Sequence, residues 1–170
     1  KKLGMKNLAI ILFLSAFTSI SAQSLDTNRY DSNNKKTGFW IEEDRYRVEA
    51  YYLNGKLHGL YKSYYRNTQT LATFGHFTNG SPTGIWYYFH ENSSLIAVLK
   101  QVKVNTEHTY QGDGGNMIMP RYTSFLTEYH PNGQVKGEGQ IIYDDFEIDF
   151  IKIGIWKCYT NKGVVIVCKD

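Results

Sequence analysis

The sequence contains one phrase twice, first as Tyr52-Leu-Asn-Gly55-Lys-Leu-His-Gly59-Leu-Tyr61-Lys-Ser-Tyr64-Tyr-Arg-Asn67 and then, 25 residues further on, as Phe77-Thr-Asn-Gly80-Ser-Pro-Thr-Gly84-Ile-Trp86-Tyr-Tyr-Phe89-His-Glu-Asn92. The shared pattern is aromatic-x-Asn-Gly-x-x-x-Gly-x-aromatic-x-x-aromatic-x-x-Asn. A period of about 20 to 50 residues indicates an array of small repeated structural units. The chain is therefore expected to be a repeat protein.

Each unit has the composition of a β-hairpin. The pairs Asn54-Gly55 and Asn79-Gly80 are flanked by aromatic and apolar residues, and Asn-Gly tolerates the positive φ angles of a tight hairpin turn. A second glycine follows at Gly59 and Gly84. Its spacing predicts a loop longer than two residues, with this glycine in a left-handed or bulged conformation.

The runs Leu60–Tyr65 and Ile85–His90 are rich in aromatic residues, which favour strands. Trp86 and Phe89 are three residues apart, so strict alternation places them on opposite faces of a sheet. Either both faces carry aromatic side chains or a bulge resets the register. The pattern leaves both alternatives open.

The rest of the chain repeats the unit less faithfully. The Gly-x-aromatic group recurs at Gly38, at Gly154 with Trp156, and at Ser124, where Ser replaces Gly and Leu126 replaces the ring. Closing turns are expected at Gly133 and at Asn161–Gly163. The segments Leu95–Leu99 and Gln101–Thr109 read as two separate strands, and an insertion occupies about residues 100–123. We expect about ten strands.

The fold class predicted is all-β, because no stretch has sustained helical periodicity. Tandem β-hairpins should pack on their neighbours in a twisted antiparallel sheet, with an elongated shape as one outcome. The repeat domain should span residues 38–170.

Residues 1–22 have the layout of a secretory signal peptide. Lys6 precedes a short apolar run, Leu8–Phe17, and small residues lead to Ala22, near which we expect cleavage. The run is too short to span a bilayer, so an exported, periplasmic or secreted chain without a membrane span is expected. Residues 23–37 are polar and predict a flexible leader.

The charge distribution argues against nucleic-acid binding. The whole chain has a net charge of +3, and Lys1, Lys2 and Lys6 supply that excess. The remaining basic and acidic residues balance and form no basic cluster, so neither a nucleic acid nor an anionic membrane surface is an expected partner.

The phrase Asn-Gly-x-x-x-Gly-x-Trp/Tyr-x-x-Tyr/Phe resembles the bacterial variant of the MORN repeat, found in proteins often labelled YwqK-family antitoxins. The resemblance is good over residues 51–92 and fair over 124–163. It implies stacked β-hairpins and an interaction or structural role rather than a shared chemistry. The residues that it makes structural are the repeat glycines and rings: Gly55, Gly59, Tyr61, Gly80, Gly84, Trp86, Gly133, Gly154 and Trp156. An antitoxin against a cytoplasmic toxin fits poorly with an export signal.

No catalytic or metal-binding constellation is predicted. The carboxylates at Glu42–Asp44 and Asp144-Asp145 lack the ligand pattern of a calcium loop, and a solvated face explains them. The five histidines have no spacing that brings two or three together. We therefore expect no cofactor, no metal and no enzymatic activity.

Cys158 and Cys168 lie on either side of the turn at Asn161–Gly163. Pairing centred near residue 162 places Cys158 opposite Ile166, so the two sulfurs are diagonal neighbours. Either a shift in the backbone allows a disulfide, which export would favour, or both are small buried residues.

Two functions are compatible with these features. The first is a protein-interaction or scaffolding module at the cell envelope, contacting its partner through Met117, Ile118 and Met119, because these apolar side chains occur where a loop is expected. The second is a glycan- or cell-wall-binding module. Phrases such as Trp86-Tyr-Tyr-Phe89 resemble choline- and glucan-binding repeats, and exposed rings could stack on sugars. We favour a role of the rings in the core.

Overall fold

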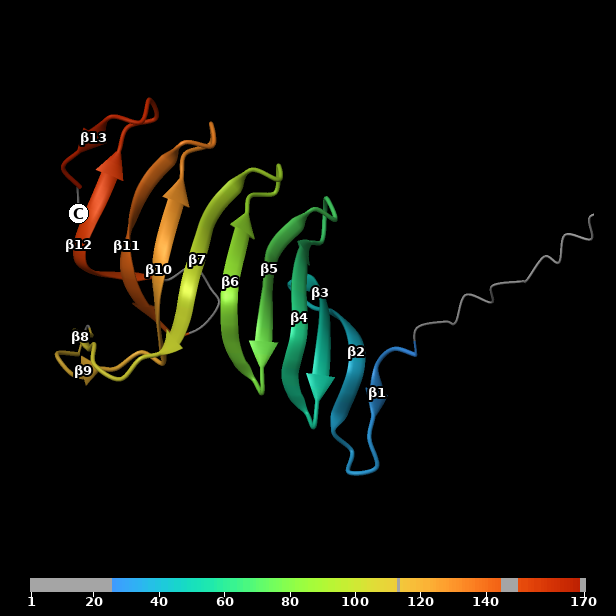
Figure 1. Ribbon diagram of the computed structural model, residues 1–170. Coiled ribbons are helices and arrows are strands. Elements are labelled where there is room, and N and C mark those ends of the chain that lie inside the picture. Colours follow the sequence, from blue (N-terminus) through green and yellow to red (C-terminus); the bar gives the residue numbers. More distant parts are fainter. Residues whose placement is uncertain (1–25, 113, 145–149, 169–170) are drawn as a thin grey trace, which may run out of the picture.

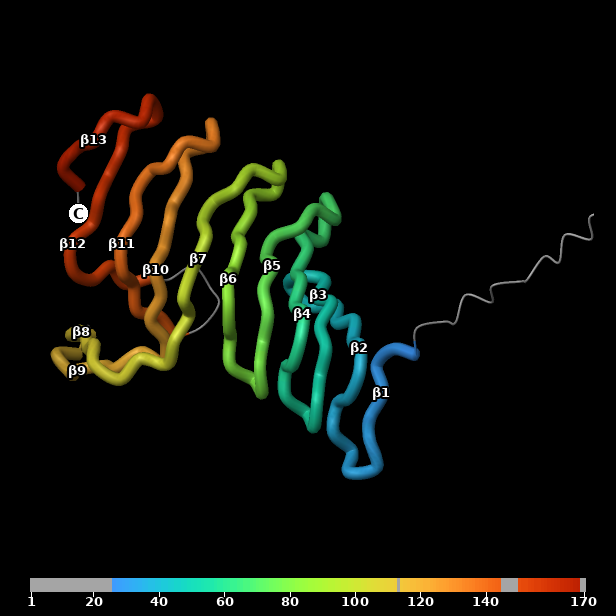
Figure 2. Tube along the Cα trace, viewed as in Figure 1, coloured from blue at the N-terminus to red at the C-terminus, as the bar shows by residue number. Residues whose placement is uncertain are grey.

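The computed structural model describes residues 26–112, 114–144 and 150–168, so the predicted signal peptide lies outside the described residues. The described residues contain strands and no helix. Eleven strands form one open antiparallel sheet in the order β1-β2-β3-β4-β5-β6-β7-β10-β11-β12-β13. Figure 1 shows them side by side along the length of the molecule, and the chain passes through them in sequence (Figure 2). The predicted all-β array of hairpins is confirmed.

The strands of the N-terminal half are β1 (Arg29–Tyr30), β2 (Lys36–Glu43), β3 (Tyr46–Leu53), β4 (Lys56–Tyr65), β5 (Leu71–Thr78) and β6 (Ser81–Phe89). Those of the C-terminal half are β7 (Leu95–Val104), β8 (Tyr110–Gln111), β9 (Met117–Ile118), β10 (Tyr122–Tyr129), β11 (Val135–Tyr143), β12 (Ile151–Tyr159) and β13 (Val165–Ile166). Strands β8 and β9 form a separate two-stranded sheet.

The repeat turns are tighter than the glycine spacing predicts. Asn54 and Gly55 have φ of 52° and 79°, and they alone separate β3 from β4. This is a two-residue turn with both central φ angles positive, which suits the twist of the flanking strands. The prediction of a longer loop is wrong, because the next glycine, Gly59, lies inside β4.

That second glycine forms a bulge. Between the pairs Phe74↔Tyr87 and His76↔Thr83, the segment 84–86 of β6 stands opposite the single residue Gly75. Gly84 has φ of 73° and faces open space, so backbone conformation rather than crowding requires glycine there. All the repeat glycines named above have positive φ: Gly55, Gly59, Gly80, Gly84, Gly133 and Gly154. In the unit where Ser124 replaces the glycine, the register shift lies between β7 and β10. There the residue with positive φ is Gln101 of β7, with φ of 58°.

The bulge turns a large side chain onto a small residue of the preceding strand. A Cβ atom added to Gly75 would lie 2.2 Å from the ring of Trp86, and one added to Gly139 would lie 2.6 Å from the ring of Trp156. Both glycines are too close to an indole to carry any side chain. They are structural positions that our sequence analysis missed.

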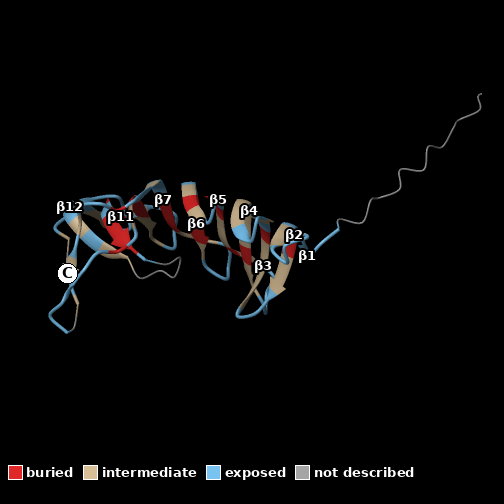
Figure 3. Cartoon of the chain, turned by 90° about the horizontal axis from the view of Figure 1, so that it is seen from below, coloured by how far each residue is buried: buried red, intermediate tan, exposed pale blue. Residues whose placement is uncertain are grey.

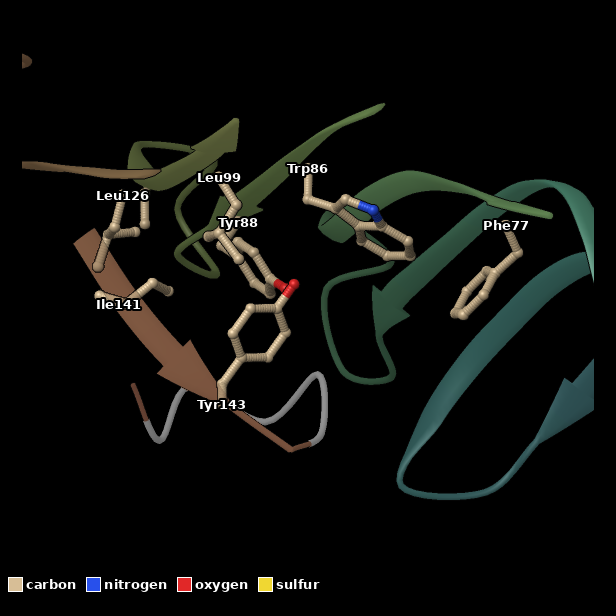
Figure 4. Packing of buried hydrophobic residues seen from close by; sticks show 8 residues of the cluster. Phe77, Trp86, Tyr88, Leu99, Leu126, Ile141 and Tyr143 are labelled. Carbon is tan, nitrogen blue, oxygen red and sulfur yellow. The ribbon is translucent and has the colours of Figure 1, made fainter. Parts of the chain in front are cut away.

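The core lies on this face of the sheet. The buried cluster consists of Phe77, Trp86, Tyr88, Ala97, Leu99, Leu126, Ile141 and Tyr143, contributed by β5, β6, β7, β10 and β11 (Figure 4). Buried positions are concentrated in these central strands, whereas the two ends of the sheet are more exposed (Figure 3). The hairpins therefore depend on one another for burial, as in other repeat proteins.

Tyr88 and Tyr143 meet within this core. Each is 1% exposed, and Figure 4 shows their hydroxyl groups pointing toward each other. Neither hydroxyl has a hydrogen-bond partner among the described residues. Burial raises the pKa of both tyrosines, because an apolar environment disfavours the phenolate. Both side chains thus stay protonated in the folded protein.

Aromatic side chains occupy both faces of the sheet, which resolves the alternative left open by the spacing of Trp86 and Phe89. Phe74 and Tyr87 pair across β5 and β6 with ring centroids 6.0 Å apart, on the face opposite Trp86. Phe39 and Tyr51 form a similar contact at 5.2 Å between β2 and β3. Bulges are present as well, so both explanations apply.

Two segments differ from their prediction. The polar stretch expected to be a flexible leader contributes β1 and the start of β2, and the side chain of Asn28 bonds both the N–H and the carbonyl of Ile41 at 2.7 and 2.9 Å. Residues 95–104 form the single strand β7 instead of parts of two strands, because the left-handed residue Gln101 is accommodated within the strand as a bulge.

A disulfide joins Cys158 to Cys168. Strands β12 and β13 pair Cys158 with Ile166, and β13 ends at that residue. Because the strand ends there, the next two residues need not follow its direction. The backbone can therefore turn so that the sulfur of Cys168, a diagonal neighbour in a regular ladder, reaches the sulfur of Cys158. The disulfide fastens a strand that pairs with β12 through two residues only.

We predict that Gly75→Ala lowers the free energy of unfolding by about 3 kcal/mol, because the new methyl group must displace the buried Trp86 ring. Urea denaturation measures this loss. Gly84→Asn is the matched control: it faces open space, and Asn tolerates positive φ, so it should cost less than about 1 kcal/mol. Equal losses in the two variants would contradict the packing described here.

Candidate functional site

The insertion between β7 and β10 forms a small hairpin that stands apart from the main sheet, at one end of its strands (Figure 1). In β8 and β9, Tyr110 pairs with Ile118 and Gln111 with Met117. The tip is closed by the bond from Gly112 N to Asn116 O, at 3.0 Å. The insertion is thus a defined projection, narrower than the predicted 100–123, because β7 continues to Val104 and β10 begins at Tyr122.

Asn105 fixes the base of this hairpin. Its side chain is 6% exposed, and its Nδ2 donates to the carbonyls of His108 and Pro120 at 2.7 and 2.8 Å. Its Oδ1 accepts from the backbone N–H of His108 at 3.0 Å. The backbone N–H of Asn105 donates to Arg121 O at 2.8 Å, which closes the neck. One buried amide therefore joins both ends of the insertion, and a short polar side chain is suited to such local bonding.

The hairpin presents apolar side chains to solvent. Met117, Ile118 and Met119 are 65%, 38% and 52% exposed, and Val104, at the end of β7, is 66% exposed. The structure thus places the three predicted contact residues together on the surface instead of under the loop. Methionine is flexible and polarizable, and it adapts to apolar partners of different shape.

A hollow of about 370 Å³ lies beside these residues. Its lining is formed by Ser81, Val104, Asn105, Met119, Pro120, Arg121 and Tyr122. Pro120 is fully buried at its floor, and Arg121 at its rim is paired with Asp144 at 3.8 Å. An apolar hollow with a paired charge at its edge suits the side chain of a protein partner.

The described residues bring no cluster of metal ligands to this site. Within residues 26–112, 114–144 and 150–168, no three His, Cys, Asp or Glu side chains converge as a metal site. In the same residues, no helix is long and apolar enough to cross a membrane. The arrangement can bind, through apolar contact and a few polar groups at the rim.

The predicted repeat residues are not part of this site. The repeat rings Tyr61 and Trp86 lie on the core face, where their centroids are 5.8 Å apart. Trp156 is half-buried beneath Lys152, whose Nζ is 4.4 Å from the ring. Val104 and Asn105 were not predicted from the sequence. The available signal was Asn105 itself, a polar residue that directly follows the alternating pattern of β7 and begins the insertion.

A family model for the MORN repeat variant matches residues 126–142. This segment runs from the core position Leu126 through the turn at Gly133 to the returning strand β11, so the match covers one hairpin of the array. The chain therefore contains a MORN repeat variant, as the phrase in the sequence suggested. No curated protein and no solved structure matches the chain significantly.

We predict that Asn105→Ala loosens the hairpin but leaves the sheet folded, because it removes four hydrogen bonds made by one buried side chain. Chymotrypsin should cut next to Tyr110 at least several-fold faster than in the wild type, and mass spectrometry locates the cut. The exposed Asn116 provides the control variant, Asn116→Ala, which should be cut at the wild-type rate. A general increase in cleavage throughout the Asn105→Ala variant would contradict a local role.

Proposed function

We propose that this protein is a non-enzymatic interaction or scaffolding module that binds a protein partner through the insertion hairpin. The observation that carries the proposal is the group of three neighbouring apolar side chains, Met117, Ile118 and Met119, held in solvent by a hairpin with a buried polar anchor. Exposed apolar groups of this kind mark interaction surfaces. MORN repeats are generally associated with protein or membrane interaction, which agrees with this proposal.

The rigidity of the hairpin also supports binding. Two hydrogen bonds link the two ends of the insertion, one from the Asn105 side chain to Pro120 O and one from the Asn105 backbone N–H to Arg121 O. Little conformational entropy is therefore lost when a partner docks. The neighbouring hollow offers a place for one anchoring side chain of the partner. Partner binding thus requires no rearrangement of the repeat sheet.

We place this module at the cell envelope, after export. The N-terminal charge and apolar pattern is that of a signal peptide, and a disulfide between Cys158 and Cys168 is stable in an oxidising compartment. Both features support the same compartment independently.

Glycan binding through the repeat tryptophans is less well supported. Trp40 and Trp86 are 6% and 0% exposed, so neither offers a free ring face to a sugar. The ring of Trp156 is covered by Lys152. We do not extend the proposal to an antitoxin role, because the family match covers one hairpin and a repeat of this kind defines a fold rather than a partner.

We predict that changing Met117, Ile118 and Met119 together to Ser abolishes capture of the partner from an envelope extract. The melting temperature should change by less than about 3 °C, since exposed side chains contribute little to stability. Affinity capture followed by mass spectrometry, with a thermal scan of each variant, gives both results.

The double variant Val165→Ser/Ile166→Ser is the matched control. These side chains are apolar and 68% and 44% exposed, but they lie on β13 at the end of the sheet. Capture should persist in this variant. If the triple variant still captures the same partner, or if it melts far below the wild type, the hairpin is not the binding surface.

A further inference from the structure

Every repeat unit has an apolar residue at the middle position of its Gly-x-aromatic group, and four of the five units expose it. These residues are Phe39, Leu60, Ile85, Phe125 and Ile155. Phe39 is half-buried, and the other four are 36%, 45%, 36% and 93% exposed. They lie on β2, β4, β6, β10 and β12, which are alternate strands in the order of the sheet. We refer to these five residues as the outer row.

The outer row lies on the face opposite the core. Successive side chains of a strand point to opposite faces, and each row residue directly precedes a core-facing residue such as Trp86 or Leu126. Four of the five, all except Phe125, follow a glycine with positive φ. A bulge redirects a side chain, so the geometry that turns the ring inward also presents its neighbour outward.

Two hollows lie along this row. One, of about 190 Å³, is lined by Phe39, Glu49, Tyr51, Leu60 and Lys62. The other, of about 100 Å³, is lined by Gln101, Lys103, Thr123, Ser124, Phe125 and Gln140. Each hollow combines a row residue with a lysine. The outer face therefore offers two shallow hollows in which an apolar row residue lies beside an ammonium group.

Three lysines lie on the outer face near the row. Lys62 pairs in register with Phe74, Lys100 with Phe125 and Lys103 with Thr123, so these lysines share the face of the row. No ion pair is recorded for any of them within the described part of the chain. On the same face, Glu43 and Glu49 contact Arg47, and Glu138 accepts a hydrogen bond from the hydroxyl of Tyr159. Glu49 also stands directly opposite Lys62, whereas no carboxylate stands opposite Lys100 or Lys103 in the register of β7 and β10.

We propose that the outer row binds an acidic amphipathic segment of a partner protein. Alternate strands are about 9.6 Å apart, close to the roughly 10.5 Å between every seventh residue of a helix. A helix with an apolar residue in each heptad and Asp or Glu beside it would place apolar side chains against successive row residues and carboxylates near Lys62, Lys100 and Lys103. This surface is separate from the insertion hairpin, and the inference does not rest on the function proposed for that hairpin.

The test uses a displayed library of random 28-residue peptides, selected in parallel against the wild-type chain and against Leu60→Gln/Ile85→Gln/Phe125→Gln. The proposal predicts that peptides enriched only on the wild type carry a net negative charge and apolar residues at heptad spacing. Fluorescence anisotropy of individual peptides should show at least a tenfold weaker affinity for the row variant, and also for Lys62→Glu/Lys103→Glu.

The control Val165→Gln changes an exposed apolar residue away from the row and should bind these peptides as the wild type does. The serine triple variant of the insertion hairpin should bind them too, which separates failure of this inference from failure of the proposed function. Enrichment of neutral or basic peptides, or equal enrichment on the row variant, would overturn the proposal. So would binding to vesicles of anionic phospholipid without any row-dependent peptide.

Discussion

The structure depends on the fit between a large side chain and a small one on the strand before it. A single sheet has no second layer to cover it, so its apolar side chains must be buried against the sheet itself. The indole of Trp86 lies over Gly75, and that of Trp156 over Gly139. Because neither glycine has a side chain, the ring approaches the backbone directly and excludes water from both strands.

The same complementarity of size holds in the units where other residues replace Trp and Gly. Tyr61 pairs with Ala50. Alanine is slightly larger than glycine, and the phenol ring of tyrosine is smaller than an indole. Leu126 takes the place of an aromatic ring, and its partner on the preceding strand is Leu99 rather than glycine. The volume of each pair is thus roughly maintained along the sheet. Such complementarity, rather than any one residue type, lets degenerate units continue the array.

The bulge determines which side chains enter the core and which reach the outer surface, where a partner could bind. It consists of a left-handed glycine followed by one outward and one inward side chain, and it therefore sets both faces at once. The insertion hairpin is positioned differently, by Asn105 and its bonds to His108 and Pro120. Its apolar side chains can change without disturbing the pairs that hold the sheet.

The sequence predicts what local chemistry determines. The Asn-Gly pairs, the period of the units and the placement of Cys158 opposite Ile166 all follow from turn geometry. The roles of Gly75 and Gly139 could not be predicted in this way, because each is defined by a ring 11 or 17 residues later in the chain. The continuity of β7 was missed for a similar reason: the strand continues through the left-handed Gln101 because β10 pairs with it both before and after that residue. The exposure of Met117–Met119 depends on the buried side chain of Asn105, which an apolar pattern does not reveal.

Collisional quenching of tryptophan fluorescence by acrylamide tests the central claim most directly. Two single-tryptophan proteins suffice, one retaining Trp86 and one retaining Trp156, with the other tryptophans changed to Phe. If the ring over Gly75 closes the core, the quenching constant of Trp86 should be several-fold smaller than that of the half-buried Trp156. Equal constants, both close to that of free tryptophan, would contradict the account.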